Sequence, residues 1–123
     1  MIRRATLTAA AIAVSLLVAR VPAHAGFGAV AYDQDAGAYG ATWNAPTQAG
    51  ANEAALKQCA SANCRVHAVE PKGCGALALS DQDKAWGGAD RETLVLAKRD
   101  ALARCQESTT AGTCAVRVSG CNK

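Results

Sequence analysis

The sequence is poor in large apolar side chains. Its 123 residues include one Phe, two Trp, two Tyr and one Met, and no Ile occurs beyond Ile12. Much of the remaining apolar content is alanine, whose burial contributes little free energy per residue. A chain of this size buries only about 60 to 70% of its unfolded surface. We therefore expect the fold to depend on a stabilising feature other than its apolar core.

The sequence also lacks the motifs of common catalytic and metal-binding classes. It contains no Cys-x-x-Cys and no Gly-x-Ser-x-Gly, the signatures of redox or zinc sites and of serine hydrolases. His67 is the single histidine beyond residue 25, and we interpret it as a surface or packing residue. Asp33-Gln34-Asp35 and Asp81-Gln82-Asp83 are interpreted as turn residues. We predict no catalytic residue, no metal ligand and no cofactor.

Residues 1–25 are typical of a secretory signal peptide. Arg3 and Arg4 precede an apolar run from Ala9 to Ala19, and Ala23-His24-Ala25 suits cleavage after Ala25. The run is shorter than the roughly 20 residues that a membrane-spanning helix needs. No later segment is as apolar, so we predict no membrane span after cleavage.

Cleavage would also change the charge balance. Removing Arg3, Arg4 and Arg20 from the thirteen basic residues leaves ten, against ten acidic residues. A near-neutral domain without a Lys/Arg cluster does not favour nucleic-acid binding.

Six cysteines all lie beyond the predicted signal peptide. An even number of cysteines in a short exported chain is typical of a disulfide framework. We predict that all six form disulfides, and that the protein is secreted or periplasmic. The residues are Cys59, Cys64, Cys74, Cys105, Cys114 and Cys121.

Residues 26–123 are predicted to form one domain that contains an internal repeat. Thr47 and Thr93 each precede a cysteine, Cys59 or Cys105, by twelve residues. Further matches pair Gly28-Ala29-Val30-Ala31 with Gly75-Ala76-Leu77-Ala78, and Ala38-Tyr39-Gly40 with Ala85-Trp86-Gly87. Such a series seldom recurs by chance, so we predict two similar halves at about 28–74 and 75–121.

Each half predicts the order strand, turn, strand, helix, strand. Residues 28–32 and 38–43 flank a reversal and favour a hairpin. Thr47 is a suitable N-cap for a helix that ends near Cys59, with small alanines on its inner face. Residues 114–119 alternate in polarity as a half-buried strand does. The predicted fold class is α+β, with two ββαβ-like repeats that form one small disulfide-stabilised domain containing antiparallel strands and two helices.

The repeat restricts the disulfide pairing. If both halves pair in the same way, seven of the fifteen possible pairings remain. Among these seven we favour a short bridge at each helix end and one bridge that joins the halves. This choice is Cys59–Cys64, Cys105–Cys114 and Cys74–Cys121.

Three aromatic residues stand out in so aromatic-poor a chain. Tyr39 and Trp86 are equivalent in the repeat, and we expect both to pack between a hairpin and a helix. Trp43 aligns with Asp90 and has no large counterpart. It is our candidate for a surface contact with a partner, and the alternative is that it fills an asymmetric core.

Several strings resemble a known bacterial family. They include Ala-Tyr-Gly-Ala-Thr-Trp-Asn, Glu-Ala-Ala-Leu-Lys-Gln-Cys and the junction Gly73-Cys74-Gly75-Ala76-Leu77-Ala78. From Gly28 to Cys121 the chain is similar to the exported family catalogued as domain of unknown function 4189. The resemblance implies export and disulfides, and it brings no catalytic residues. The stretch after Trp86 departs from the pattern, because it has fewer alternating Trp and Gly residues.

These observations favour a non-enzymatic binding or interaction module that acts outside the cytoplasm. Its expected partner is an unknown protein or a cell-envelope component. Two alternatives stay open. One is an inhibitor or immunity protein against a secreted toxin or lysozyme-like enzyme, and the other is a small secreted effector.

Overall fold

The computed structural model describes residues 26–123, so the predicted signal peptide lies outside the described residues. Each half has the ββαβ order that the sequence predicted, and the fold is α+β. The elements are β1 (Phe27–Asp33), β2 (Ala38–Ala45), α1 (Gln48–Cys59), β3 (Arg65–Val69), β4 (Cys74–Ser80), β5 (Trp86–Arg91), α2 (Leu94–Ser108) and β6 (Cys114–Cys121).

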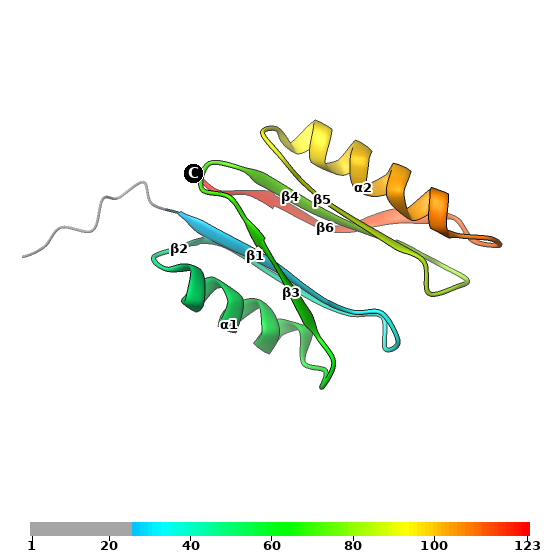
Figure 1. The fold of residues 1–123 in the computed structure, drawn as a ribbon, viewed down its shortest axis with the longest axis horizontal. Coiled ribbons are helices and arrows are strands. Elements are labelled where there is room, and N and C mark those ends of the chain that lie inside the picture. The colour runs from blue at the N-terminus through cyan, green and yellow to red at the C-terminus, as the bar shows by residue number, and fades with distance from the viewer. Residues whose placement is uncertain (1–25) are drawn as a thin grey trace, which may run out of the picture.

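The elements form four layers. Each half contributes one antiparallel sheet, with strand order β2-β1-β3 in the first and β5-β4-β6 in the second. The two sheets face each other, and α1 and α2 cover their outer faces (Figure 1). Each helix therefore packs on the sheet of its own half, and the halves meet sheet to sheet.

Both helices begin at the predicted threonines. The Thr47 side chain accepts a hydrogen bond from the Gly50 backbone N–H at 3.0 Å, and Thr93 accepts one from Leu96 at 3.3 Å. Such caps satisfy backbone donors that have no partner within the helix.

The helix–sheet layers are built from small residues. Gly40 and Gly87 lie where each helix crosses its sheet. A Cβ atom on Gly40 would lie 2.5 Å from the Ala55 carbonyl oxygen, and one on Gly87 would lie 2.2 Å from that of Ala101. Close approach therefore requires glycine on the strand and small residues on the helix, as the alanine pattern predicted. Fully or almost fully buried helix residues are Ala51, Ala55, Cys59, Ala97, Ala101 and Cys105.

The sheet–sheet layer contains the larger side chains. Leu77 is 1% exposed at its centre, and the half-buried Trp43 and Trp86 pack at its margins. The other buried members are Val30, Tyr32, Ala41, Val69 and Leu79. Every buried Val, Leu and Tyr of residues 26–123 thus lies where the halves meet.

The expected packing of Tyr39 and Trp86 between hairpin and helix is wrong. Successive side chains in a strand point to opposite faces of the sheet. Because Gly40 and Gly87 face the helices, the preceding aromatics face away from them. Trp86 packs against Tyr32 with 5.4 Å between ring centroids, whereas Tyr39 is 39% exposed.

All six cysteines form disulfides, in the pairing that we favoured: Cys59–Cys64, Cys105–Cys114 and Cys74–Cys121. The expectation that Cys74–Cys121 joins the halves is wrong. Cys74 is the first residue of β4 and pairs directly with Cys121 of β6, so this bridge lies within the second sheet.

Both ends of the described chain lie beside Asn44. A Cβ atom on Gly26 would lie 2.8 Å from Asn44 Oδ1 and 3.1 Å from the carbonyl oxygen of Lys123. The first strand therefore begins next to the point where the last one ends.

Candidate binding groove

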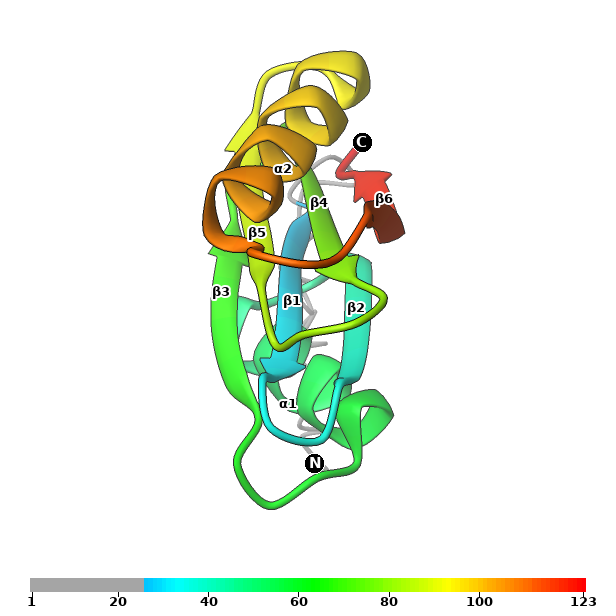
Figure 2. The ribbon, with the colours of Figure 1, turned by 90° about the vertical axis from the view of Figure 1, so that its right-hand side faces the viewer.

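The sheet sandwich has two sides, because each three-stranded sheet has two edge strands. β2 and β6 lie along one side, and β3 and β5 lie along the other (Figure 2). The repeat makes β2 equivalent to β5 and β3 equivalent to β6. Any difference between the two sides must therefore arise from individual side chains.

The side formed by β2 and β6 is closed by an indole ring. The Trp43 side chain on β2 lies over Gly120 of β6, where an added Cβ atom would be 2.4 Å from Trp43 Cε2. The same ring reaches Gly75 of β4, where an added Cβ atom would lie 3.2 Å from Cη2. Two glycines in the opposite sheet thus make room for one tryptophan.

This packing bears on our interpretation of Trp43. The side chain is half-buried and belongs to the sheet–sheet cluster, which matches the alternative that Trp43 fills an asymmetric core. Direct contact between Trp43 and a partner stays a prediction.

Asn122 joins the halves next to Trp43. Its side chain is 4% exposed and donates to the carbonyl oxygens of Val69 at 3.1 Å and Glu70 at 2.9 Å. It also accepts a hydrogen bond from the Asn44 backbone N–H at 3.0 Å. One buried amide therefore connects the end of β6 with β2 and with the end of β3.

The side formed by β3 and β5 is open. Two adjoining cavities of about 460 Å³ and about 290 Å³ lie along it, and both are lined by His67 of β3 and Trp86 of β5. We call these cavities together the β3–β5 groove. The exposed His67 ring lies 5.8 Å from the Trp86 ring, centroid to centroid, as expected for a surface residue with a packing contact.

The larger cavity lies next to the turn between β1 and β2. Its lining includes Tyr32, Asp33, Asp35 and Arg65. Burial raises the pKa of Tyr32 above 10.0, and the negative charges of Asp33 and Asp35 raise it further. The Tyr32 hydroxyl therefore stays protonated and can donate a hydrogen bond.

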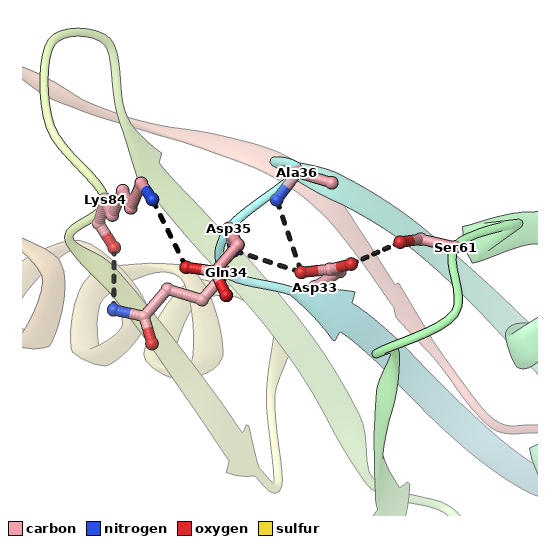
Figure 3. Close-up of polar contacts among 6 residues, drawn as sticks. All are labelled: Asp33, Gln34, Asp35, Ala36, Ser61 and Lys84. Carbon is pink, nitrogen blue, oxygen red and sulfur yellow. Dashed lines mark hydrogen bonds and ion pairs between the residues drawn. The ribbon is translucent and has the colours of Figure 1, made fainter.

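Polar contacts connect the two halves at this end of the groove. Gln34 Nε2 donates to the Lys84 carbonyl oxygen at 3.2 Å, and Lys84 Nζ lies 3.2 Å from Asp35 Oδ1 (Figure 3). The turn between β1 and β2 is thus held against the turn between β4 and β5.

The carboxylates of the two Asp triplets hold turns together. Asp33 Oδ1 accepts from the backbone N–H groups of Asp35 and Ala36, and Asp33 Oδ2 accepts from the Ser61 hydroxyl (Figure 3). The Ser61 hydrogen bond is the main reason that the pKa of Asp33 lies below 3.8. The interpretation of Asp33 as a turn residue is confirmed.

Asp83 performs the same task in the second half. Its pKa lies far below the usual carboxyl value, chiefly because of hydrogen bonding with Ser80, followed by that with Thr110 and Thr109. Its turn role was also predicted. Neither Asp33 nor Asp83 is free to take up a proton near neutral pH.

The smaller cavity has an apolar floor made by Val30, Val69 and Leu77. Arg104 reaches its rim from α2 and donates to the Gly88 carbonyl oxygen of β5. This contact covers a main-chain acceptor on the edge strand.

The sequence indicated some of these residues individually and missed their arrangement. His67 and Trp86 were singled out separately, but their contact depends on how the two sheets dock. Asn122 and Arg104 were not identified, since neither belongs to a local motif. The mismatch between Trp43 and Asp90 was the one sequence signal that the two sides differ.

No cluster of three or more potential metal ligands occurs within residues 26–123. In the same part of the chain, no helix combines the length and the apolar character that crossing a bilayer requires.

Comparison with known proteins gives the family. Residues 27–121 match the model described as Domain of unknown function (DUF4189). The chain belongs to the DUF4189 family. This DUF4189 domain resembles the NMR structure of Rv1813c from Mycobacterium tuberculosis, with a TM-score of 0.61 and 25% identity over 98% of this chain and 99% of that one.

Two curated relatives are also similar to this DUF4189 domain. They are Protein Rv1269c of Mycobacterium tuberculosis and Protein Mb1300c of Mycobacterium bovis, each 38% identical over 78 residues. The matched region covers 63% of this chain and 60% of either relative. The chain therefore spans about three fifths of the length of these relatives.

Proposed function

We propose that this DUF4189 domain is an exported, non-enzymatic binding module that holds its ligand in the β3–β5 groove. One observation carries the proposal. Of two sides related by the repeat, one is filled by Trp43 and the other contains cavities lined by His67 and Trp86. Concave surfaces that combine aromatic and polar side chains are typical ligand sites.

Export is supported by the disulfides. Three bridges are typical of an oxidising environment outside the cytoplasm. The sequence of residues 1–25 supports the same location through its resemblance to a signal peptide. We therefore propose that the domain acts in the periplasm or the medium.

Binding rather than catalysis is supported by what the reactive groups already do. All six cysteines are in disulfides, and the carboxylates of Asp33 and Asp83 hold turns. The groove is also cross-linked, because Cys59–Cys64 ties the end of α1 to the start of β3 and the Gln34–Lys84 contact joins the two turns. A preformed site loses little conformational entropy when it binds.

Site-specific photocrosslinking tests the proposal. Arg65 is exposed, pairs with Tyr32 of the sheet–sheet layer and lines the larger cavity, so Arg65→p-benzoylphenylalanine places a photoreactive group at the groove. Val95 is 76% exposed on α2, and the same substitution there is the matched control. Irradiation with an envelope extract or culture medium should yield a discrete adduct from the Arg65 variant that is absent from the Val95 variant.

Trp86→Ala in the Arg65 variant should weaken that adduct, because the indole lines both cavities. Equal labelling from both positions would contradict the groove as the binding site. Turnover of peptidoglycan or peptides by the purified domain would contradict the non-enzymatic part of the proposal. Inhibition of a captured hydrolase would identify the module as an inhibitor.

A further inference from the structure

We propose that the occupant of the groove is an extended polypeptide segment that adds a strand to the free edge of β3. This inference rests on the proposed function and names the chemistry of the ligand. It predicts main-chain hydrogen bonds along β3 and one apolar side chain in the smaller cavity.

The main chain of β3 has one free edge. Within residues 26–123, β3 pairs with β1 alone, so its other edge has backbone donors and acceptors without a strand partner in that part of the chain. Among the described residues, side chains bond to backbone at Val69 and Glu70, and none bonds to the main chain of residues 65–68. An uncovered edge is a template for pairing with another chain.

On the facing edge of β5, a side chain covers the main chain in the middle of the strand. Arg104 donates to the Gly88 carbonyl oxygen and so covers part of that edge. Proteins commonly protect an edge strand with a charged side chain. On β5 the covered acceptor lies in the middle of the strand, at Gly88, whereas on β3 it lies at the last residue, Val69. Residues 65–68 are therefore the longer open stretch on the groove, which assigns the incoming strand to β3.

Polar contacts mark both ends of the open segment. Lys84 contacts Gln34 and Asp35 at one end, and Asp90 Oδ2 accepts from the Glu70 N–H at 3.3 Å at the other. Between them lies the five-residue β3, whose length is about 17 Å at about 3.3 Å per residue. The groove therefore suits an extended segment of about five residues.

The residues that line the two cavities indicate which side chains of the added segment would be apolar and which polar. Alternate residues of an added strand point to the same face, about 6.6 Å apart. One such residue would lie over the floor of Val30, Val69 and Leu77, which favours an apolar side chain. The next would lie near Tyr32 and Arg65, which favours a polar one.

The experiment uses a phage-displayed library of random linear heptapeptides as the probe. Selection on oxidised residues 26–123 should enrich peptides in which one apolar and one polar position are two residues apart. Synthetic versions are then N-methylated at each position in turn. Methylation removes one donor, so about tenfold weaker binding is expected at alternate positions and little change at the others.

Gly88→Val tests the smaller cavity. Gly88 lines the smaller cavity, and a Cβ atom there would lie 3.4 Å from Trp86 Cζ3, at the short end of ordinary contact, so a larger side chain at this position takes up cavity space. Peptide binding should weaken about tenfold, since a displaced apolar side chain loses its burial. Val95→Glu, on the exposed face of α2, is the matched control and should leave binding unchanged.

The N-methyl scan does not depend on any protein variant, so a folding defect of Gly88→Val would not obscure the answer. The inference would be overturned if the loss of affinity on N-methylation did not alternate along the peptide. It would also be overturned if the selected peptides bound the Gly88→Val variant as tightly as the unsubstituted domain. An Arg65 adduct that contains glycan or lipid and no polypeptide would overturn it too, although the proposed function would then stand. Absence of any groove-specific adduct would remove both proposals.

Discussion

The two sides of the sandwich are built from equivalent strands and differ in what they hold. On the closed side Trp43 of β2 packs over Gly120, six residues after Cys114. On the open side the corresponding contact joins Asp90 of β5 to Glu70, six residues after Cys64. The indole ring of Trp43 thus fills one side of the sandwich. The smaller Asp90 at the equivalent position leaves a groove on the other side.

Under the proposed function, this difference is what gives a repeated motif its binding site. Both copies keep the residues that set the helix on the sheet, such as Gly40 and Gly87. The difference between Trp43 and Asp90 lies on the face where the copies meet, where a substitution changes the space between the sheets. If the closed side supplies stability and leaves the open side free for binding, substitutions on the closed side should lower the free energy of unfolding more than substitutions on the open side.

The largest expected effect comes from the disulfide on the closed side. Replacing Cys74 and Cys121 by Ser removes a bridge with a sequence separation of 47, which should lower the free energy of unfolding by about 4 kcal/mol. The bridge between Cys59 and Cys64, with a separation of 5, should contribute about 2 kcal/mol. Urea unfolding of the two double-Ser variants measures both, and a larger loss at the shorter bridge would contradict the ranking.

Trp43→Ala should have the next largest effect. It leaves a void over Gly75 and Gly120, and truncation of a packed aromatic costs about 3 kcal/mol. Asp90→Ala at the equivalent position should cost less than about 1 kcal/mol, because it removes an exposed hydrogen bond. Similar losses from both variants in denaturant titrations would show that the sides contribute equally.

Asn122→Ala should cost about 2 kcal/mol. It leaves the carbonyl oxygens of Val69 and Glu70 and the N–H of Asn44 without their side-chain partner. Asn52, which is partly buried on α1, gives a matched Asn→Ala control that makes one side-chain contact, with Gln48. Amide exchange should accelerate at the ends of β2 and β3 in the Asn122 variant, and unchanged exchange there would contradict its joining role.

The smallest expected effect is a loss of stability at low pH through protonation of Asp33. The folded pKa of Asp33 lies below the 3.8 of a free carboxyl, so its ionised form stabilises the fold above about pH 4. That contribution is lost as the pH falls through the lowered pKa. Ser61→Ala removes the main cause and should bring the pKa of Asp33 closer to 3.8. NMR titration of the carboxyl carbon measures it, and an unchanged value would exclude the Ser61 hydrogen bond as the cause.

Local features of the fold were predictable because they depend on neighbouring residues. Thr47 and Thr93 mark the helix starts, alanines identify the inner helix faces, and the repeat narrowed the disulfide pairing. The expected placement of Tyr39 and Trp86 was wrong because each directly precedes a glycine that faces the helix. Successive side chains of a strand point to opposite faces of the sheet, so both aromatics point away from the helices. Gly40 and Gly87 were a usable signal for the strand face that approaches the helix.

The groove could not be predicted from the sequence, because the residues that form it are distant along the chain. Its two walls come from β3 and β5, which lie in different halves and meet through the docking of two sheets. Asn122 bonds with residues about fifty and eighty positions away. Such contacts depend on the relative placement of the halves, which no local periodicity encodes.

The meeting of Gly26 and Lys123 beside Asn44 has a consequence for the order of the two copies. A short linker between these ends would close the backbone into a ring, and a new opening in the connection between β3 and β4, residues 70–73, would then exchange the positions of the copies. Such a circular permutant would retain every strand pairing and all three bridges. The order in which the copies are synthesised is therefore separable from the architecture that they form.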